Sequence, residues 1–201
     1  MSKAFKEMLA KIAAGSRVHT SQLYIFSRLD QDDLQIFQQG WPNIPTQRRR
    51  DIMQELVEIC EANFEVSFDP VFFLGLGDED AQVRASAING LWENETIALI
   101  NPLLHLLRHD PASQVRATAA SALGKFIYLR ELEELDQAQG LLVEEALLAT
   151  IHQPQEDTEV RRRAIEAIAY SGEANIIDII ENAYYDDDEK MQVSAIFAMG
   201  R

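Results

Sequence analysis

The sequence predicts an all-α protein, a right-handed α-α superhelix in which helix pairs stack one after another as a solenoid. Two observations support this prediction. A short motif recurs along the chain at intervals of roughly 30 to 45 residues, and the apolar residues inside each copy follow the period of an α-helix. The chain of 201 residues is 47% hydrophobic, which is sufficient for a sizeable buried core.

The recurring motif begins with Val-Arg in its clearest copies and has an alanine four residues later. Four copies align without gaps: VRASAINGLW from Val83, VRATAASALG from Val115, VRRRAIEAIA from Val160 and MQVSAIFAMG from Met191. A weaker copy, RRRDIMQEL, begins at Arg48. We write the first residue of each copy as V and count later positions from it, so that the recurrent alanine is V+4.

Each copy predicts one helix with a single apolar face. Positions V, V+4, V+5 and V+8 fall on that face, as Val115, Ala119, Ala120 and Leu123 illustrate. Alanine at V+4 lets a neighbouring helix approach closely, because a longer side chain would force the two helices apart. We expect these helices, the second or B helices of their repeats, near residues 46–63, 80–93, 113–128, 158–171 and 189–200.

A second apolar run precedes each copy and ends in acidic turn residues, as in NPLLHLLRHDPAS ahead of the second clear copy. The pairs Asp69-Pro70 and Asn101-Pro102 fit a helix cap followed by proline at the first helical position. Asp110-Pro111 fits a turn that starts the next helix. Each repeat is therefore expected to contain a helix A, a tight turn and a helix B.

Residues 1–29 do not match the repeat, and we expect them to form an N-terminal helical cap on an array of about five helix pairs in residues 30–201. Phe5, Leu9 and Ile12 lie on one side of the first amphipathic segment and would cover the first repeat. The last copy is followed by no comparable cap. We expect either that the array continues beyond residue 201 or that an oligomer forms through this edge.

The segment from Asp110 to Gly124, D-P-x-x-x-V-R-x-x-A-x-x-A-L-G, resembles a HEAT repeat of the type found in phycobilisome-lyase-like proteins. The resemblance covers residues 66–201 well and residues 30–65 more weakly. It implies a HEAT-like solenoid in which turn aspartates and helix B arginines form a ladder between successive repeats. The ladder residues implied here are Asp78 or Asp80 with Arg84, Asp110 with Arg116, and Asp157 with Arg161, whereas Gln192 replaces the arginine in the last copy.

The spacing between the second and third clear copies is longer than the others and places extra residues around 128–140. This stretch, YLRELEELDQAQG, is rich in acidic residues. It is interpreted as a solvated helical extension, and the alternative is a partner-specific loop, because insertions in repeat arrays project from the stack.

Composition excludes several classes of function. The net charge of −15 disfavours binding to nucleic acids and to anionic membranes. Cys60 is the single cysteine and is interpreted as a core residue, and the charged residues near the start of the chain do not fit a signal peptide. Because no apolar run is long enough to span a membrane, we predict a cytoplasmic protein without membrane or nucleic-acid partners.

The sequence predicts no catalytic residues, no bound cofactor and no metal site. The His-Glu pairs of iron-dependent HEAT-type hydroxylases do not occur, and there is no glycine-rich phosphate loop or nucleophile elbow. His105 and His109 lie four residues apart and could contact one metal ion, but no third ligand is evident. They are interpreted as surface or partly packed histidines.

The remaining candidate is a protein-binding face. Helices B line the concave side of such arrays, so their exposed positions V+2, V+3, V+6, V+9 and V+10 are expected to contact a partner. The candidate residues are Asn89, Trp92, Glu93, Lys125, Arg162, Arg163, Glu166, Tyr170 and Phe197. The leading hypothesis is a non-enzymatic scaffold or adaptor for a protein or peptide partner, because aromatic residues and arginine dominate interface energies.

Three alternatives stay open. Trp92 and Tyr170 could instead seal the ends of their helices against neighbouring repeats. The basic runs at residues 48–50 and 161–163 could be solvated or ladder residues, or could bind a carboxylate-rich peptide. The resemblance also implies a lyase-like or maturation-factor subunit that acts on a bound protein or tetrapyrrole pigment, although no residue is identified that would attach a pigment.

Overall fold

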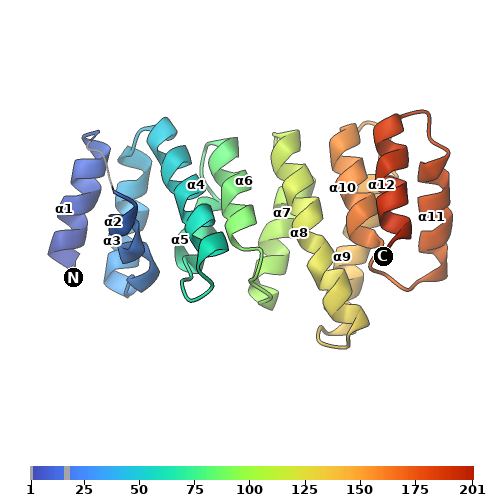
Figure 1. Ribbon diagram of the computed structural model, residues 1–201, viewed down its shortest axis with the longest axis horizontal. Helices are drawn as coiled ribbons and strands as arrows, with labels where there is room; N and C mark the ends of the chain where they lie inside the picture. The colour runs from blue at the N-terminus through green and yellow to red at the C-terminus, as the bar shows by residue number, and fades with distance from the viewer. Residues whose placement is uncertain (1, 16–18) are drawn as a thin grey trace. The chain divides into compact units, whose positions relative to one another are not determined.

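The computed structural model describes the backbone of residues 2–15 and 19–201 (Figure 1). Within these ranges every regular element is helical, which confirms the predicted all-α fold class. The chain divides into two compact units, Met1–Glu93 and Asn94–Arg201, which we call the first and second units and describe separately.

The first unit is built from α-helices joined by turns and short 3₁₀ segments. Helix α1 packs against α3, α3 against α5, and α4 against α6, while α5 and α6 form an antiparallel pair (Figure 1). The elements are α1 Ser2–Ala13, α2 Thr20–Leu23, η1 Tyr24–Arg28, α3 Gln31–Gly40, η2 Trp41–Asn43, α4 Thr46–Ala62, α5 Asp69–Gly75 and α6 Ala81–Gly90.

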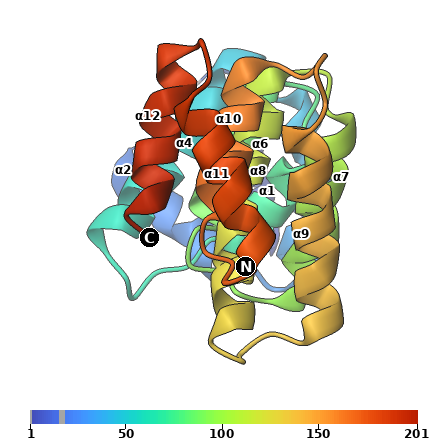
Figure 2. The same cartoon turned by 90° about the vertical axis from the view of Figure 1, so that its right-hand side faces the viewer.

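The second unit contains three successive helix pairs. Helix α8 packs against α10 and α10 against α12, while α7, α9 and α11 pair with α8, α10 and α12 respectively. In Figure 2, α7 and α9 lie side by side, and α11 and α12 face the viewer. The elements are η3 Ile97–Leu99, α7 Ile100–His109, α8 Ser113–Glu131, α9 Gln137–Ile151, α10 Thr158–Ile168, α11 Ala174–Tyr184 and α12 Glu189–Met199.

Each segment predicted as a helix B contains one helix, and these are α4, α6, α8, α10 and α12. The alanines at V+4 are fully buried, with 0% exposure at Ala87, Ala119, Ala164 and Ala195. Close approach of the helices extends to Gly124, where an added Cβ would lie 3.1 Å from the Cα of Ala167 on α10. Small residues therefore set the spacing between α8 and α10.

Two predicted helix caps are wrong. Helix α5 already begins at Asp69, with Phe68 at the cap position. Helix α7 begins at Ile100 because it continues directly from the 3₁₀ turn η3, so Asn101 lies inside the helix. At Asp110 the structure has a turn, in which the carboxylate accepts a 2.9 Å hydrogen bond from the amide of Ala112 just before α8.

The boundary predicted at residue 29 stays a prediction. In the structure α1 and α2 pack against α3 and α4, inside the first unit. Phe5 and Ile12 are fully buried, and Phe5 meets Phe26 edge-on at 5.8 Å between ring centroids. The N-terminal segment thus shares the core of the first repeats.

The extra residues around 128–140 lengthen two helices that belong to successive pairs. Helix α8 continues to Glu131, a short turn follows, and α9 begins at Gln137, so that the joined ends of α8 and α9 extend beyond the neighbouring helices in both views (Figures 1 and 2). Arg130 is buried there and donates a 2.6 Å hydrogen bond to Glu144 on α9. The acidic residues of the turn are exposed, whereas Arg130 anchors the extension to the core.

Candidate functional site

The predicted partner-binding residues of the first unit lie at the end of α6. Asn89 is on the last turn of the helix, and Trp92 and Glu93 follow it. All three are exposed, and half of the Trp92 side chain is accessible. An indole that remains 50% exposed offers a large apolar surface to a partner.

In the second unit, the polar candidates on α10 are engaged within the unit. Arg162 donates to the carbonyl of Lys190 at 2.9 Å and to Ser194 Oγ at 3.0 Å, and both acceptors lie on α12. Ser194 Oγ in turn donates to Glu166 at 2.7 Å. Arg163 pairs with Glu166 at 2.8 Å and is 41% exposed. These residues connect α10 to α12, and only Arg163 presents a substantial charged surface.

An aromatic cluster lies at the C-terminal ends of the B helices in the second unit. Tyr128 and Tyr170 meet edge-on with ring centroids 5.6 Å apart. The guanidinium of Arg201 lies 4.6 Å from the Tyr170 ring centroid and 4.5 Å from that of Phe197, and it also donates to the Tyr170 hydroxyl. Tyr128 and Phe197 are each 48% exposed. We refer to Tyr128, Tyr170, Phe197 and Arg201 as the aromatic cluster.

Sequence reasoning missed two members of this cluster. Arg201 occupies V+10, the same position as Tyr170 and Lys125, so the rule used for the other candidates could have found it. Tyr128 lies beyond the repeated motif, on the extended end of α8, and no repeat signal marks it. Lys125 lies one turn before Tyr128, with its ammonium 5.4 Å from the ring centroid of Phe126.

Position V+2 is not uniformly exposed, contrary to the expectation. Ala85 and Ala117 occupy it in two copies and are buried. Within the second unit, V+2 points toward the following repeat, as the contact of Arg162 with α12 shows. The exposed candidates are instead found at V+6, as Asn89 and Phe197, and at the end of α6, as Trp92 and Glu93.

The helix B arginines at V+1 donate hydrogen bonds to backbone carbonyls at the end of helix A or in the turn that follows it. Arg84 donates to the carbonyls of Asp78 and Glu79 at 2.7 and 3.0 Å, and Arg116 donates to that of Asp110 at 2.8 Å. Arg161 donates to the carbonyl of Ile151 at 3.1 Å. These contacts satisfy the last carbonyls of helix A and its turn, which would otherwise lack partners.

The carboxylate partner of Arg116 differs from the one that the resemblance implied. Arg116 pairs with Glu156, in the turn of the next repeat, through a 2.6 Å contact and two further hydrogen bonds. Asp157 caps α10 by accepting from the amide of Glu159, and Arg161 does not contact its carboxylate. Asp157 thus caps its own helix, α10. The carboxylate that pairs with Arg116 belongs instead to Glu156, in the turn of the next repeat.

We call such a contact, from an arginine on one helix B to a carboxylate in the turn of the next repeat, a forward pair. A forward pair also builds a buried ionic centre in the first unit. Arg49, at V+1 on α4, is 2% exposed and lies 3.1 Å from Asp78, whose side chain is 3% exposed. Arg49 also contacts Glu79 at 2.6 Å and donates to the carbonyl of Ile44 at 2.9 Å. The indole of Trp41 donates to Asp78 at 2.6 Å. Asp78 therefore joins α4 and η2 to the turn before α6.

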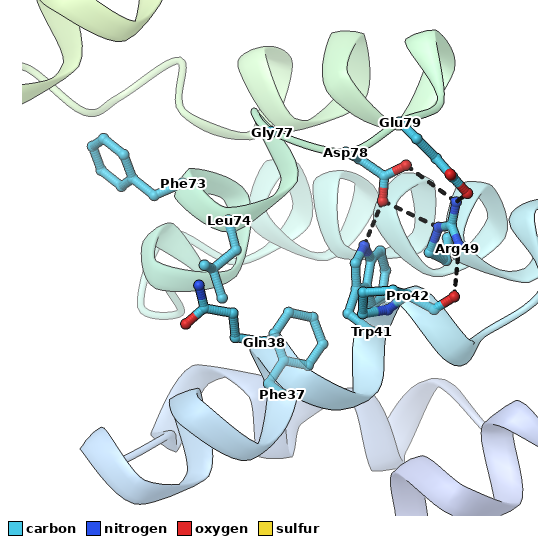
Figure 3. A pocket seen from close by; sticks show the side chains of 10 residues that line it. All are labelled: Phe37, Gln38, Trp41, Pro42, Arg49, Phe73, Leu74, Gly77, Asp78 and Glu79. Carbon is cyan, nitrogen blue, oxygen red and sulfur yellow. Dashed lines mark hydrogen bonds and ion pairs between the residues drawn. The ribbon is translucent and has the colours of Figure 1, made fainter.

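This ionic centre forms one wall of a pocket of ≈ 520 Å³ (Figure 3). The residues that line it are Phe37, Gln38, Trp41, Pro42, Arg49, Phe73, Leu74, Gly77, Asp78 and Glu79. Figure 3 shows the contacts of Arg49 and Trp41 converging on Asp78 at one side, with the side chains of Phe37, Phe73 and Leu74 at the other. Because Arg49 and Asp78 are bound to each other, the centre is built to hold the repeats together.

Asp80 makes a second forward pair. Its carboxylate accepts two hydrogen bonds from Arg50, at 2.9 and 2.5 Å, and caps α6 by accepting from the amides of Gln82 and Val83. The hydrogen bond from Arg50 is the main reason that the pKa of Asp80 falls to about 2. The same pairing raises the pKa of Arg50.

The pKa of Asp80 leads to a testable pH dependence. Because the folded pKa lies below the unfolded value of about 3.9, ionised Asp80 stabilises the fold above pH 4 and this contribution is lost as the pH falls through about 2. We expect Arg50→Gln to raise the pKa of Asp80 toward its ordinary value, measured by carbon-13 NMR titration of the carboxylate. The exposed Arg28 provides the control Arg28→Gln, which should leave that pKa unchanged. A wild-type pKa near 4 would contradict the pairing.

The remaining ligand-forming side chains do not converge. His105 and His109 are exposed on α7, with ring centroids 5.1 Å apart. Among the described residues, no group of three or more histidine, cysteine or acidic side chains is placed to hold a metal ion.

Cys60 is buried with its Sγ 3.6 Å from the carbonyl of Val66, and burial raises the pKa of its thiol. Within the part of the chain that the structure describes, no helix is long and apolar enough to cross a membrane.

Comparisons with known proteins identify the repeat type. Residues 70–142 match a family model described as HEAT repeats. The chain is similar to the complex of CpcE and CpcF of phycocyanin lyase from Nostoc sp. PCC7120, with a TM-score of 0.60 and 17% identity over 85% of this chain and 99% of that chain. It is also similar to a designed armadillo repeat protein, with a TM-score of 0.55 and 16% identity over 98% of both chains. No curated protein matches the sequence.

These likenesses show HEAT repeats in residues 70–142 and a fold whose structural neighbours are helical repeat solenoids. At 17% and 16% identity they concern the fold alone. The function is therefore argued from the residues of this chain.

Proposed function

We propose that the protein is a non-enzymatic scaffold that binds a protein or peptide partner through exposed positions of its B helices. The observation that carries the proposal is the aromatic cluster, in which Tyr128 of α8, Tyr170 just after α10, Phe197 of α12 and Arg201 just after α12 meet at the surface of the second unit. Tyrosine loses little conformational entropy for the contact area it provides, and both tyrosine and arginine are enriched among residues that dominate binding energy.

The cluster also differs in charge from the rest of the protein. The chain carries a net charge of −15, yet the cluster contains Arg201 and is adjacent to Lys125. An extended segment with apolar or aromatic side chains flanked by carboxylates would complement it, because the apolar groups cover the rings and the carboxylates meet the cations. Trp92 offers a similar apolar anchor in the first unit.

Substitutions in the cluster test this proposal. We expect the double variant Tyr128→Ala/Phe197→Ala to reduce recovery of a native partner from cell extract by at least about tenfold, because each change removes a half-exposed ring from the contact surface. The control is Tyr185→Ala, an 81% exposed tyrosine outside the cluster, which should recover the partner as the wild type does. Identical recovery by all three proteins would remove the cluster as the binding surface, and Trp92→Ala tests the first unit in the same way.

A second candidate function is a lyase-like or maturation-factor subunit that acts on a bound protein or tetrapyrrole pigment. Its support is the similarity to the phycocyanin lyase complex, which extends over 85% of this chain. This candidate predicts a change in bilin absorbance or fluorescence when the pigment is mixed with the protein. An unchanged spectrum at high protein concentration would argue against it and would leave the scaffold proposal intact.

We also infer that the protein acts in the cytoplasm and does not bind nucleic acid. The inference about nucleic acid rests on the net charge of −15, which repels phosphate backbones.

A further inference from the structure

Arg161 on α10 lacks the carboxylate partner that two other arginines at V+1 have. Arg49 and Arg116 occupy this position in earlier copies, and each makes a forward pair with the turn of the next repeat. Arg161 keeps the contact with the preceding turn, where its Nε donates to the carbonyl of Ile151 at 3.1 Å. Its terminal nitrogens Nη1 and Nη2 make no hydrogen bond or ion pair with the described residues. The guanidinium therefore has donors available for an acceptor.

The turn ahead of α12 explains why this forward pair is missing. Position V−4, four residues before V, is a glutamate in turns that take part in forward pairs, Glu79 and Glu156. Ahead of α12 the same position is Asp187, whose side chain is one methylene shorter. Asp187 is exposed and makes no ion pair with the described residues. The place that a V−4 carboxylate would take beside Arg161 is therefore open.

This open place belongs to a pocket of ≈ 370 Å³ in the second unit. Arg161 and Asp186 supply charged groups to its lining, and Ile165, Ile179 and Met191 supply apolar side chains. The lining residues come from the end of α9, from α10 and α11, and from the start of α12, so the pocket lies between two helix pairs that the structure describes. Its volume is within the range of about 300–1,000 Å³ that is typical of small-ligand sites.

The pocket of the ionic centre in the first unit occupies the equivalent place in its repeat (Figure 3). Both pockets are lined by a proline at V−6, the arginine at V+1 and the aspartate at V−5 of the following turn. These residues are Pro42, Arg49 and Asp78 in the first unit and Pro154, Arg161 and Asp186 in the second. The second pocket thus has the same carboxylate-binding arginine, but the arginine has no carboxylate bound to it.

Asp186 lines the pocket without replacing the missing partner. Its carboxylate accepts a 2.9 Å hydrogen bond from the amide of Asp188 and makes no ion pair with the described residues. In the first unit, Arg49 contacts two carboxylates at once, Asp78 at 3.1 Å and Glu79 at 2.6 Å. One arginine beside two carboxylates therefore has a precedent in this protein, and Asp186 is compatible with an anionic ligand.

We propose that this pocket binds a carboxylate attached to an apolar group, with Arg161 as its cation. The carboxylate takes the place of the V−4 glutamate, because a guanidinium binds a carboxylate through two parallel hydrogen bonds. The apolar group faces Ile179 and Met191, and the exposed amide of Asn182 offers a further donor. A peptide C-terminus with an apolar last residue and a small branched carboxylic acid both carry this chemistry.

An NMR titration of the full chain tests the preference for a carboxylate. The probe is 4-methylpentanoate, and its neutral counterpart is 4-methylpentanamide. We expect the carboxylate to shift the side-chain amide signals of Asn182 and to bind at least about tenfold more tightly than the amide. Arg161→Gln should weaken carboxylate binding by at least about tenfold. The control Arg108→Gln, at an exposed arginine of the same unit, should leave binding unchanged. Equal binding of the two probes, or unchanged binding by Arg161→Gln, would overturn the proposal.

Asp187→Glu tests the site without changing the charge of the protein. The longer side chain is expected to complete the forward pair with Arg161 and so to weaken binding of 4-methylpentanoate by at least about tenfold. The matched control is Asp178→Glu, at an exposed carboxylate on α11, which should bind as the wild type does. A general attraction of the anion to arginine would be the same in both variants, so unchanged binding by Asp187→Glu would contradict the proposed site.

Two further comparisons identify the source of the carboxylate and separate this proposal from the scaffold proposal. Tighter binding of the peptide acetyl-Gly-Gly-Leu than of 4-methylpentanoate would assign a chain terminus, and equal binding a small carboxylic acid; both results support the pocket. Tyr128→Ala/Phe197→Ala should leave 4-methylpentanoate binding unchanged, because neither residue lines the pocket. Loss of binding in that double variant would assign the carboxylate to the aromatic cluster and would overturn the proposal.

Discussion

Replacing Asp78 with alanine is expected to lower the free energy of unfolding by up to about 3–5 kcal/mol, because the substitution removes the buried carboxylate that pairs with Arg49 and leaves only the exposed Glu79 as its carboxylate partner. The guanidinium is 2% exposed and lies 3.1 Å from Asp78, so the lost carboxylate leaves a buried cation short of acceptors. The indole of Trp41 would lose its 2.6 Å hydrogen bond at the same time. Urea unfolding followed by circular dichroism measures the change.

Two further variants isolate the reason for this loss. Asp187→Ala removes an exposed carboxylate and should change the free energy of unfolding by no more than about 0.5 kcal/mol. Adding Arg49→Met to Asp78→Ala removes the buried charge that has lost its buried carboxylate while keeping apolar volume, and it should recover part of the stability. If the double variant were as unstable as Asp78→Ala alone, the penalty would not come from the buried cation.

Gly90→Ala is expected to destabilise the first unit by about 1–3 kcal/mol through overpacking. A Cβ at this position would lie 2.4 Å from ring atoms of Phe72, which is itself fully buried between α5 and α6. The ring cannot move away without displacing other core residues, so the contact outweighs the gain in helix propensity that alanine brings.

The control for this prediction is Gly77→Ala in the same unit. There the nearest atom to an added Cβ is the carbonyl oxygen of Leu74 at 3.7 Å, which is ordinary contact. We expect the free energy of unfolding of Gly77→Ala to equal that of the wild type or to rise slightly, because alanine restricts the unfolded chain. Equal effects of the two substitutions would show that the Phe72 contact is not the cause.

The repeat signal made the B helices predictable, whereas features without a period were not. Alanine at V+4 and apolar residues at V and V+8 mark α8 and α10 directly, because burial on one side imposes the helical period. The start of α7 was misplaced because η3 runs into it without a capping residue. Such a junction depends on tertiary packing and leaves no local signal.

The candidate site was predicted only in part for a similar reason. Tyr170 and Phe197 could be found from their positions in the motif, but Tyr128 lies on an extension that only one repeat possesses. The acceptors of the arginines depend on where the next turn lies in space, so the pairing of Arg116 with Glu156 was not accessible from the copy that contains Arg116. Residue types were predictable, and their partners were set by the stacking of the repeats.

In each forward pair the arginine belongs to one repeat and the carboxylate to the repeat that follows it in the chain. Arg49 and Arg116 each depend on a carboxylate that comes later in the chain, 29 and 40 residues on respectively. While the chain is synthesised, each cation is therefore made before its partner, and a repeat that closes early buries an unmatched positive charge. Burial of each of these arginines therefore becomes favourable only when the turn that supplies its carboxylate is present.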